Sequence, residues 1–399
     1  MKYDQRTFFV LIALIGGLAI FSSTLSKTPV LPLFAHALNA SPAEIGWIVM
    51  ASTIPGVLIS YPAGALSDQL GQRRLLLASL VVFATAPFLY LLIETPWQLM
   101  AVRFYHGFAT AIFGTVASAA IAARYTADRA AKLSTYSSIT IVGRSIAPFL
   151  GGFLISLASF NAVYIACAIS GVLALGAGLL LRDHDPTPTA KQEWPPFWAS
   201  LTTVLRDRSI MLVSGVEAAQ YLVFGAIEAF IALYAASLGI PAWQIGVILG
   251  VQLVSIVFAK PLMGRVSDRV GRKQIIIPGL LIGAASVALL PLASSFFVLA
   301  GLSLLFGIGF ATVTSSTAAL VADLTQNGRY GSSMGVLRTV MDVGQSIGPV
   351  LTGWMIGMAG YGSAFTLLAA ILVLAALLLG LVFKQKKTGG THPAQRDQI

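Results

Sequence analysis

The sequence predicts an all-α membrane protein whose twelve transmembrane helices form two pseudo-symmetric six-helix bundles. Composition, the pattern of apolar segments and an internal repeat each support this fold class. Of the 399 residues, 57% are hydrophobic and 10% are charged, whereas a soluble protein carries about 25% charged residues. This apolar content excludes a disordered chain, and the single cysteine, Cys167, excludes a disulfide scaffold.

Twelve apolar segments are long enough to cross a bilayer, for which about 20 residues suffice. The first segment is too long for a signal-peptide core and lacks a small-residue cleavage pattern, so it counts as a span. The predicted spans are 7–36, 44–66, 74–93, 97–121, 132–157, 161–182, 210–236, 242–263, 274–293, 296–322, 330–357 and 361–383.

One long polar segment, rich in proline and aspartate, divides the chain and is typical of a linker. It contains the run Asp183-His184-Asp185, but three consecutive residues rarely converge on one ion, so we expect no metal site. The predicted units are an N-terminal bundle, 1–182, a cytoplasmic linker, 183–208, a C-terminal bundle, 209–383, and a cytoplasmic tail, 384–399.

The basic residues predict how the chain crosses the membrane. Five of the 25 Lys and Arg residues fall inside predicted spans, and the other 20 flank the same side of the membrane. By the positive-inside rule, both termini and the linker are then cytoplasmic. The net charge of +10 therefore reports topology rather than a nucleic-acid partner. We expect a multi-pass protein of the cell membrane, the inner membrane of a bacterium.

An internal repeat appears when the chain is shifted by 200 residues. Residues 44–46 align with 244–246, and residues 64–71 align with 264–271. With a shift of 201, Gly143-Arg144-Ser145-Ile146-Ala147-Pro148 aligns with Gly344-Gln345-Ser346-Ile347-Gly348-Pro349. Each copy begins on the same side and holds six spans, which is the arrangement of a rocking transporter with its site between the halves. A duplicated channel is the alternative, but no segment resembles a filter loop.

These features resemble the major facilitator superfamily over about residues 7–383. The resemblance rests on the twelve spans, the duplicated Gly-x-x-x-Asp-x-x-Gly loop after spans 2 and 8, and the Gly-x-x-x-Ala-Pro-x-x-Gly-Gly pattern of span 5. The first loop departs from the family pattern at Gln69 and Gln72, where basic residues are usual. The resemblance implies the superfamily fold and points to its 12-span proton-coupled antiporter and efflux branch.

The duplicated loops predict cytoplasmic gates. A carboxylate facing a helix N-terminus is worth about 0.3–1 kcal/mol, and the resemblance implies that Asp68 faces span 11 near Tyr330, with Asp268 in the matching role. The alternative is a solvated turn whose charges only set topology. The glycines permit close approach and a tight turn. The gating candidates in the loops are Gly64, Asp68, Gly71, Arg73, Arg74, Gly264, Asp268, Gly271 and Arg272.

Span 5 adds three gating candidates, Gly143, Ala147 and Pro148. Small residues every four positions give a smooth face on which a second helix packs closely. Pro148 removes one backbone hydrogen bond and permits a bend. The resemblance associates this pattern with antiporters, and the alternative is generic helix packing.

Charges inside spans are costly and are functional candidates by default. From the rise of about 1.5 Å per residue, Arg144 lies roughly 18 Å into a core of about 30 Å. Arg338 and Asp342 lie roughly 12 and 18 Å beyond Tyr330, share one helix face with Gln345, and are expected to pair. We predict that Arg144, Arg338, Asp342 and Gln345 bind substrate, since such sites lie near the midplane.

Span 7 carries a second stripe, because Glu217, Tyr221, Phe224 and Glu228 share one helix face. The two carboxylates lie about 16 Å apart along the axis, one near each end of a central cavity. Desolvation favours the protonated form of a carboxyl group, as proton coupling requires. We predict proton coupling by Glu217, Glu228 or Asp342, with Tyr221 and Phe224 against an apolar part of the substrate. The alternative is that each carboxylate neutralises a structural Arg or Lys.

Three other spans carry isolated basic groups. The run 99–107 resembles the span-4 motif of the family, which implies that Arg103 takes part in proton transfer or binding. His106 either titrates beside it or is a hydrogen-bonded packing residue. Lys27 stands in span 1, where many multidrug members carry an acidic residue, and is a further substrate-binding candidate. Lys260 is expected to extend toward the cytoplasmic end of span 8.

Basic groups outnumber acidic ones inside the spans, and unpaired arginine favours an oxyanion. We therefore predict a secondary transporter that exports an amphipathic or organic-anionic small molecule by proton antiport. The alternatives are a proton symporter that imports an anionic nutrient and a transport-inactive membrane sensor. We expect neither an enzyme nor a cofactor, and the chain carries no phosphate-binding loop for ATP. The expected partners are the lipid bilayer, the small-molecule substrate and protons, and we expect a monomer.

Overall fold

The computed structural model describes residues 5–56, 58–59, 71–181, 206–325 and 330–382. Within these ranges all regular secondary structure is helical, and ten helices are long and apolar enough to cross a membrane. The first half contains α1 (Gln5–Leu25), α2 (Val30–Ala37), α3 (Pro42–Ala51), α5 (Gln72–Tyr90), α6 (Pro96–Arg124), α7 (Arg129–Leu157) and α8 (Phe160–Leu179). The second half contains α10 (Arg208–Ser237), α11 (Ala242–Val270), α12 (Arg272–Leu289), a short 3-10 turn (Leu290–Leu292), α13 (Phe296–Leu324) and α14 (Tyr330–Val382).

The ten candidate spans cover eleven of the twelve predicted ones. Helix α14 covers both 330–357 and 361–383, and it breaks at Gly360, whose φ of 78° is not helical. The predicted span 44–66 begins as α3, and its last residues lie outside the described part of the chain.

The first predicted span, 7–36, is interrupted rather than continuous. It consists of α1 and α2, separated by a non-helical turn from Ser26 to Pro29. Pro29 has no backbone N–H to continue the helix, and its ring disfavours helical geometry at Thr28. This turn lies inside the predicted membrane region and carries Lys27.

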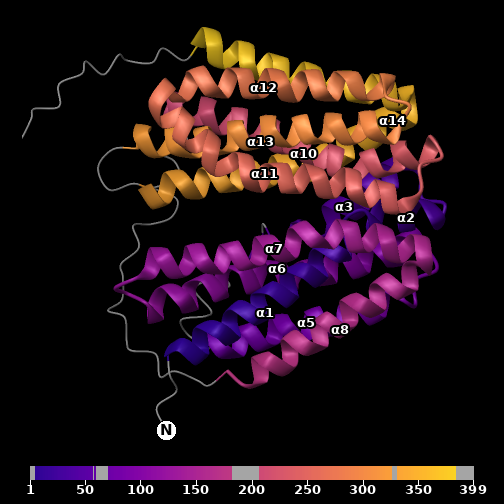
Figure 1. Cartoon of the computed structure of the whole chain (residues 1–399), viewed down its shortest axis with the longest axis vertical. Coiled ribbons are helices and arrows are strands. Elements are labelled where there is room, and N and C mark those ends of the chain that lie inside the picture. The colour runs from indigo at the N-terminus through magenta and orange to yellow at the C-terminus, as the bar shows by residue number, and fades with distance from the viewer. Residues whose placement is uncertain (1–4, 57, 60–70, 182–205, 326–329, 383–399) are drawn as a thin grey trace, which may run out of the picture.

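The two halves lie next to each other, the first running from indigo to magenta and the second from salmon through orange to yellow (Figure 1). Between them, α3 packs on α14 and α7 packs on α11, while α10 also contacts α2 and α3. Helices α3 and α7 thus play the same part in the first half that α11 and α14 play in the second. The interface has the two-fold character that the sequence repeat predicts.

The molecule has a charged end and a neutral end. At the charged end α6 stops at Arg124, α7 starts at Arg129 and α12 starts at Arg272. At the neutral end, the described loops 38–41, 91–95, 158–159, 238–241 and 293–295 contain no Lys or Arg. The halves diverge toward the charged end, at the left of Figure 1.

The halves share a hydrophobic core near the neutral end. Val30, Leu31 and Val49 of the first half belong to the same buried cluster as Phe230 and Leu233 of the second. Within a bilayer such contacts are held by van der Waals packing, because lipid tails are as apolar as the side chains. The neutral end is therefore closed by apolar packing.

Candidate functional site

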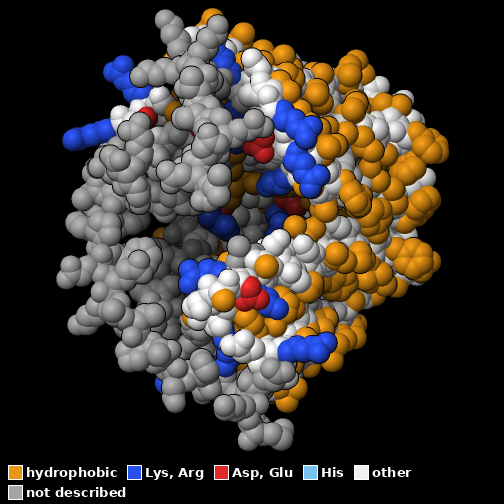
Figure 2. Space-filling view, turned by 60° about the vertical axis from the view of Figure 1, so that its left-hand side comes forward, with side chains coloured by type: hydrophobic (Ala, Val, Ile, Leu, Met, Phe, Trp, Pro, Cys, Tyr) orange, Lys and Arg blue, Asp and Glu red, His pale blue; other side chains and the backbone are white. Residues whose placement is uncertain are grey.

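A hollow separates the two halves at the charged end. Figure 2 shows this hollow with basic and acidic side chains inside it, while the outer surface on one side is largely hydrophobic. The charges of Glu217, Arg144, Arg338 and Asp342 all act on the ring hydroxyl of Tyr221. Three helices, α7, α10 and α14, thus bring five of the predicted site residues into one neighbourhood.

Arg144 is an exposed cation of this neighbourhood. Within the described ranges, no carboxylate lies within 4.0 Å of its side chain. Its charge acts on Glu228, Tyr221 and Lys260. An exposed guanidinium without a carboxylate partner is suited to bind an oxyanion.

The predicted pairing of Arg338 with Asp342 is wrong. Both residues are on α14, but no ion pair within 4.0 Å joins them in the described part of the chain. Arg338 is exposed and Asp342 half-buried, so the two charges interact only through space. Gln345, further along the same helix, lies against the backbone of α10, where a Cβ added to Gly225 would stand 3.2 Å from its Cγ.

One ion pair joins the two halves among the described residues. The ammonium group of Lys27 donates to Oε2 of Glu228 at 2.8 Å, and the hydroxyl of Thr28 donates to Oε1 at 3.0 Å. The side chains are 25% and 12% exposed. Glu228 therefore neutralises a lysine here, which is the alternative that the sequence left open for each span-7 carboxylate.

Glu217, on the same helix face, has a different environment. It is 3% exposed and accepts a hydrogen bond from the hydroxyl of Thr317 on α13. The charge of Lys260 acts on it through space. Glu217 is thus a buried carboxyl whose only hydrogen-bond donor within the described ranges is neutral.

The extension of Lys260 toward the cytoplasmic end of span 8 stays a prediction. Helix α11 continues to Val270, so Lys260 lies about 15 Å from its end at a rise of 1.5 Å per residue. The helix is longer than the predicted span because the polar residues of the loop motif continue it. The side chain of Lys260 is exposed, and its charge acts on Glu217 and Arg144.

The predicted aromatic residues form a packed cluster. Ring centroids of Tyr221 and Phe224 lie 5.0 and 4.4 Å from that of Phe310 on α13. Phe224 is 8% exposed, whereas Tyr221 is half-buried. Tyr221 is thus the member of the cluster that reaches the charged neighbourhood.

Arg103 and His106 lie apart from the hollow, in the core of the first half. Their exposed fractions are 4% and 2%. Arg103 donates to the hydroxyl groups of Ser52 at 2.8 Å and Tyr90 at 3.3 Å, and Nδ1 of His106 lies 3.3 Å from the same Tyr90 hydroxyl. This geometry makes His106 a hydrogen-bonded packing residue and links α3, α5 and α6.

Two of the gating candidates, Gly64 and Asp68, lie outside the described residues. Gly71 and Gly271 have φ values of 90° and 110°, a left-handed geometry that glycine adopts at no steric cost and that starts α5 and α12. Arg73 donates to backbone carbonyls at the end of α8, and Arg74 is exposed.

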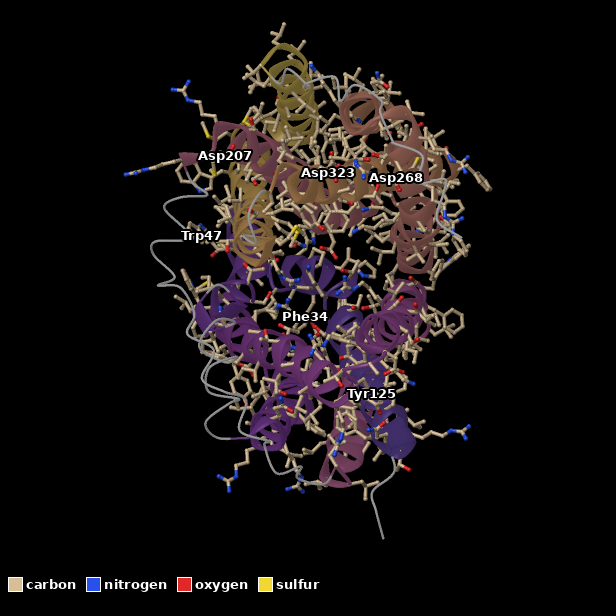
Figure 3. The ribbon with its side chains drawn as sticks, turned by 90° about the vertical axis from the view of Figure 1, so that its left-hand side faces the viewer. Phe34, Trp47, Tyr125, Asp207, Asp268 and Asp323 are labelled. Carbon is tan, nitrogen blue, oxygen red and sulfur yellow. The ribbon has the colours of Figure 1, made fainter. Side chains whose placement is uncertain are left out.

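In the second loop, Arg272 pairs with Asp268 and, at 3.1 Å, with Asp323. Figure 3, which looks toward the charged end, shows Asp268 and Asp323 side by side on the second half. In the described ranges Asp268 makes no ion pair with the first half. At the charged end this network therefore stays within one bundle.

At the neutral end, the span-5 candidates lie in a tight contact between the halves. A Cβ added to Gly246 would stand 2.5 Å from the carbonyl oxygen of Pro148, and one added to Gly152 would stand 2.3 Å from that of Ala242. Ala147 is fully buried, and Gly143 faces α1, where its Cβ would stand 3.0 Å from the carbonyl oxygen of Gly17. Helix α7, which contains the predicted span 5, thus packs on α1 with one face and on α11 with the neighbouring face.

The partner contact between α3 and α14 repeats this geometry. A Cβ on Gly46 would stand 2.5 Å from the carbonyl oxygen of Pro349, and one on Gly353 would stand 2.2 Å from that of Pro42. The hydroxyls of Thr53 and Ser346 lie 2.6 Å apart across the same interface.

Sequence reasoning missed four polar partners: Thr28, Thr317, Ser52 and Tyr90. For Thr28, the internal repeat could have indicated the contact with Glu228. Thr28 and Glu228 are 200 residues apart, so they occupy equivalent positions and meet at the pseudo-two-fold axis. The other three partners carry no pattern that marks them in a single sequence.

Comparison with known proteins gives a consistent picture. The family model described as Major Facilitator Superfamily matches residues 12–243 and 213–398. The multidrug transporter MdfA of Escherichia coli is 25% identical, covering 93% of each chain. The staphyloferrin B transporter of Staphylococcus aureus is 25% identical, covering 88% of this chain and 87% of its own. The crystal structure of the nucleoside transporter NupG superposes with a TM-score of 0.82 at 16% identity, over 95% of this chain and 99% of that one.

Proposed function

Because the chain belongs to the Major Facilitator Superfamily, we propose that it is a proton-coupled secondary transporter that exports an amphipathic or organic-anionic small molecule by alternating access. Membership makes the protein a multi-pass membrane transporter rather than an enzyme. Its relatives carry the names of multidrug, staphyloferrin B and nucleoside transporters. The proposed substrate class therefore rests on the hollow rather than on any one relative.

The observation that carries the proposal is the uncompensated positive charge in the hollow. Lys27 is neutralised by Glu228, Lys260 and Glu217 act on each other, and Arg338 acts on Asp342. After these three pairings, no carboxylate of this group remains to balance the charge of Arg144. A site with one surplus arginine binds a substrate with one negative group better than a neutral or cationic one.

The positive-inside rule supports a cytoplasmic charged end. In that orientation the hollow faces the cytoplasm, where an exporter collects its substrate. Glu217 is the proposed proton carrier, because a buried carboxyl beside a neutral hydroxyl can exchange a proton as the halves move. Arg103 and its hydroxyl partners are proposed to hold the first bundle together beneath the site.

Transport in proteoliposomes tests this function. A thermal-shift screen first ranks matched probes with permanent charges, 2-naphthalenesulfonate and (2-naphthyl)trimethylammonium. An inward proton gradient should then drive efflux of the sulfonate against its own gradient and leave the quaternary ammonium unmoved. Movement of the anion together with protons would replace the antiporter by the importing symporter. A preference for the cation would contradict the assigned substrate class.

Removing either arginine should weaken anion binding. In Arg144→Ala and Arg338→Ala, loss of a charge-assisted hydrogen bond should cost about 1.5–3 kcal/mol, or roughly 10- to 150-fold in affinity. Isothermal titration with the sulfonate measures this change. Arg208→Ala, an exposed arginine at the start of α10, is the matched control and should bind as wild type does. Full affinity in both hollow variants would place the substrate elsewhere.

A further inference from the structure

The turn between α1 and α2 holds a carboxylate at two points. Two adjacent residues, Lys27 and Thr28, each donate to a different oxygen of the same carboxylate, at 2.8 and 3.0 Å. An ammonium and a hydroxyl directed at the two oxygens of one group are the contacts by which proteins recognise carboxylates. The carboxylate that fills this cradle comes from Glu228 on the opposite half.

The cradle lies where both halves can act on it. Lys27 and Thr28 belong to the non-helical turn inside the predicted membrane region, and discontinuous helices are typical of substrate sites in such transporters. Leu31, Val49 and Ala229 line the same cavity as the ion pair, which has a volume of about 10 Å³, so an apolar group would fit beside them only once the halves separate. The site is therefore polar at one point and apolar around it.

A second cation stands near the same carboxylate. The charge of Arg144 acts on Glu228 from α7, and among the described residues Arg144 has no ion pair of its own. Two cations thus compete for one carboxylate. A second carboxylate would allow each cation to have its own partner.

We propose that Lys27 and Thr28 form the recognition site for a carboxylate group of the substrate, and that Glu228 holds this site until the substrate displaces it and Glu228 pairs with Arg144. This inference rests on the proposed function and narrows its substrate class from oxyanions to carboxylates. The displaced contact is also the one ion pair that joins the halves in the described chain. Substrate binding and the release of one contact between the halves would then be the same event. The substrate would thereby bind the two states with different affinity.

Chemical rescue of Glu228→Ala tests the cradle without knowledge of the substrate. The substitution removes a CH2–COO⁻ unit, which acetate matches in size and charge. Acetate should raise the Tm of purified E228A saturably and bind it at least about 10-fold more tightly than it binds wild type. Acetamide should do neither, and the double variant K27M/E228A should not respond to acetate. Glu94→Ala, an exposed carboxylate at the neutral end, controls for non-specific effects.

A second variant keeps the test decisive if E228A does not fold. Glu228→Gln preserves the shape of the side chain and removes its charge, so acetate should bind E228Q more tightly than wild type and Lys27→Met should abolish the gain. Equal acetate binding by wild type, E228A and E228Q, or rescue that persists without Lys27, would overturn the carboxylate site. Failed rescue with intact anion efflux would refute the site alone, whereas rescue without any proton-driven flux would refute the transport function alone.

Discussion

Gly46→Ala is expected to move the protein away from the state closed at the neutral end and to slow transport. The added Cβ would stand 2.5 Å from the carbonyl oxygen of Pro349 and 2.9 Å from Cα of Val350. These are backbone atoms of the opposite half, so α3 and α14 must separate to make room. Overpacking of this kind costs about 1–3 kcal/mol, roughly 5- to 150-fold in the population of the closed state. Initial transport rates and the accessibility of an introduced cysteine at the neutral end measure the effect.

Matched glycines separate this conformational effect from loss of stability. Gly246→Ala, the repeat equivalent, should behave like G46A, because its Cβ meets Pro148 of the opposite half. Gly171→Ala should instead lower the Tm, because its Cβ would stand 2.3 Å from the carbonyl oxygen of Phe83 in the same half. A Cβ added to Gly176 would have no neighbour within 4 Å, so Gly176→Ala should change neither the Tm nor the transport rate. If G46A and G176A transported equally well, closure of the neutral end would not depend on this contact.

Glu217→Gln is expected to uncouple transport from the proton gradient. The amide oxygen of Gln can still accept the hydrogen bond from Thr317, so the core of the second half should keep its packing. The side chain can no longer bind and release a proton. Exchange of labelled for unlabelled substrate should persist, whereas the gradient-driven accumulation ratio should fall at least about 10-fold, a loss of about 1.4 kcal/mol or more of coupling free energy.

Thr317→Val is the control, because it keeps the carboxyl and removes only its hydrogen-bond donor. It should retain gradient-driven transport, with a changed pH dependence. Full accumulation by E217Q would exclude Glu217 as the proton carrier and leave Asp342, the half-buried carboxyl of α14, as the candidate in the hollow.

The repeat is the part of the fold that the sequence predicts best. Its aligned segments contain the residues that meet between the halves: Gly46 with Pro349, and their equivalents Gly246 with Pro148. A parallel repeat requires such symmetric contacts, since each surface must fit the equivalent of its own partner. The repeat thus marks segments that meet in the closed interface, whereas the contacts between them come from the structure.

The ion pair of Lys27 with Glu228 could not be predicted in the same way. Local spacing rules relate residues on one helix, and this pair joins two halves through a turn that Pro29 creates. The same rules failed for Arg338 and Asp342, because one side chain is exposed and the other is half-buried. The spacing of residues along one helix therefore does not by itself predict which side chains pair.

Distances across both ends of one molecule test alternating access most directly. With Cys167 replaced by serine, spin labels on Glu94 and Ser294 report the neutral end, and labels on Thr126 and Arg269 report the charged end; all four residues are exposed. Pulsed electron paramagnetic resonance should give two distances at each end, one for each conformation. In G46A the population with the longer neutral-end distance should rise, together with the population with the shorter charged-end distance. A single distance at each end, unchanged by G46A and by saturating substrate, would contradict alternating access.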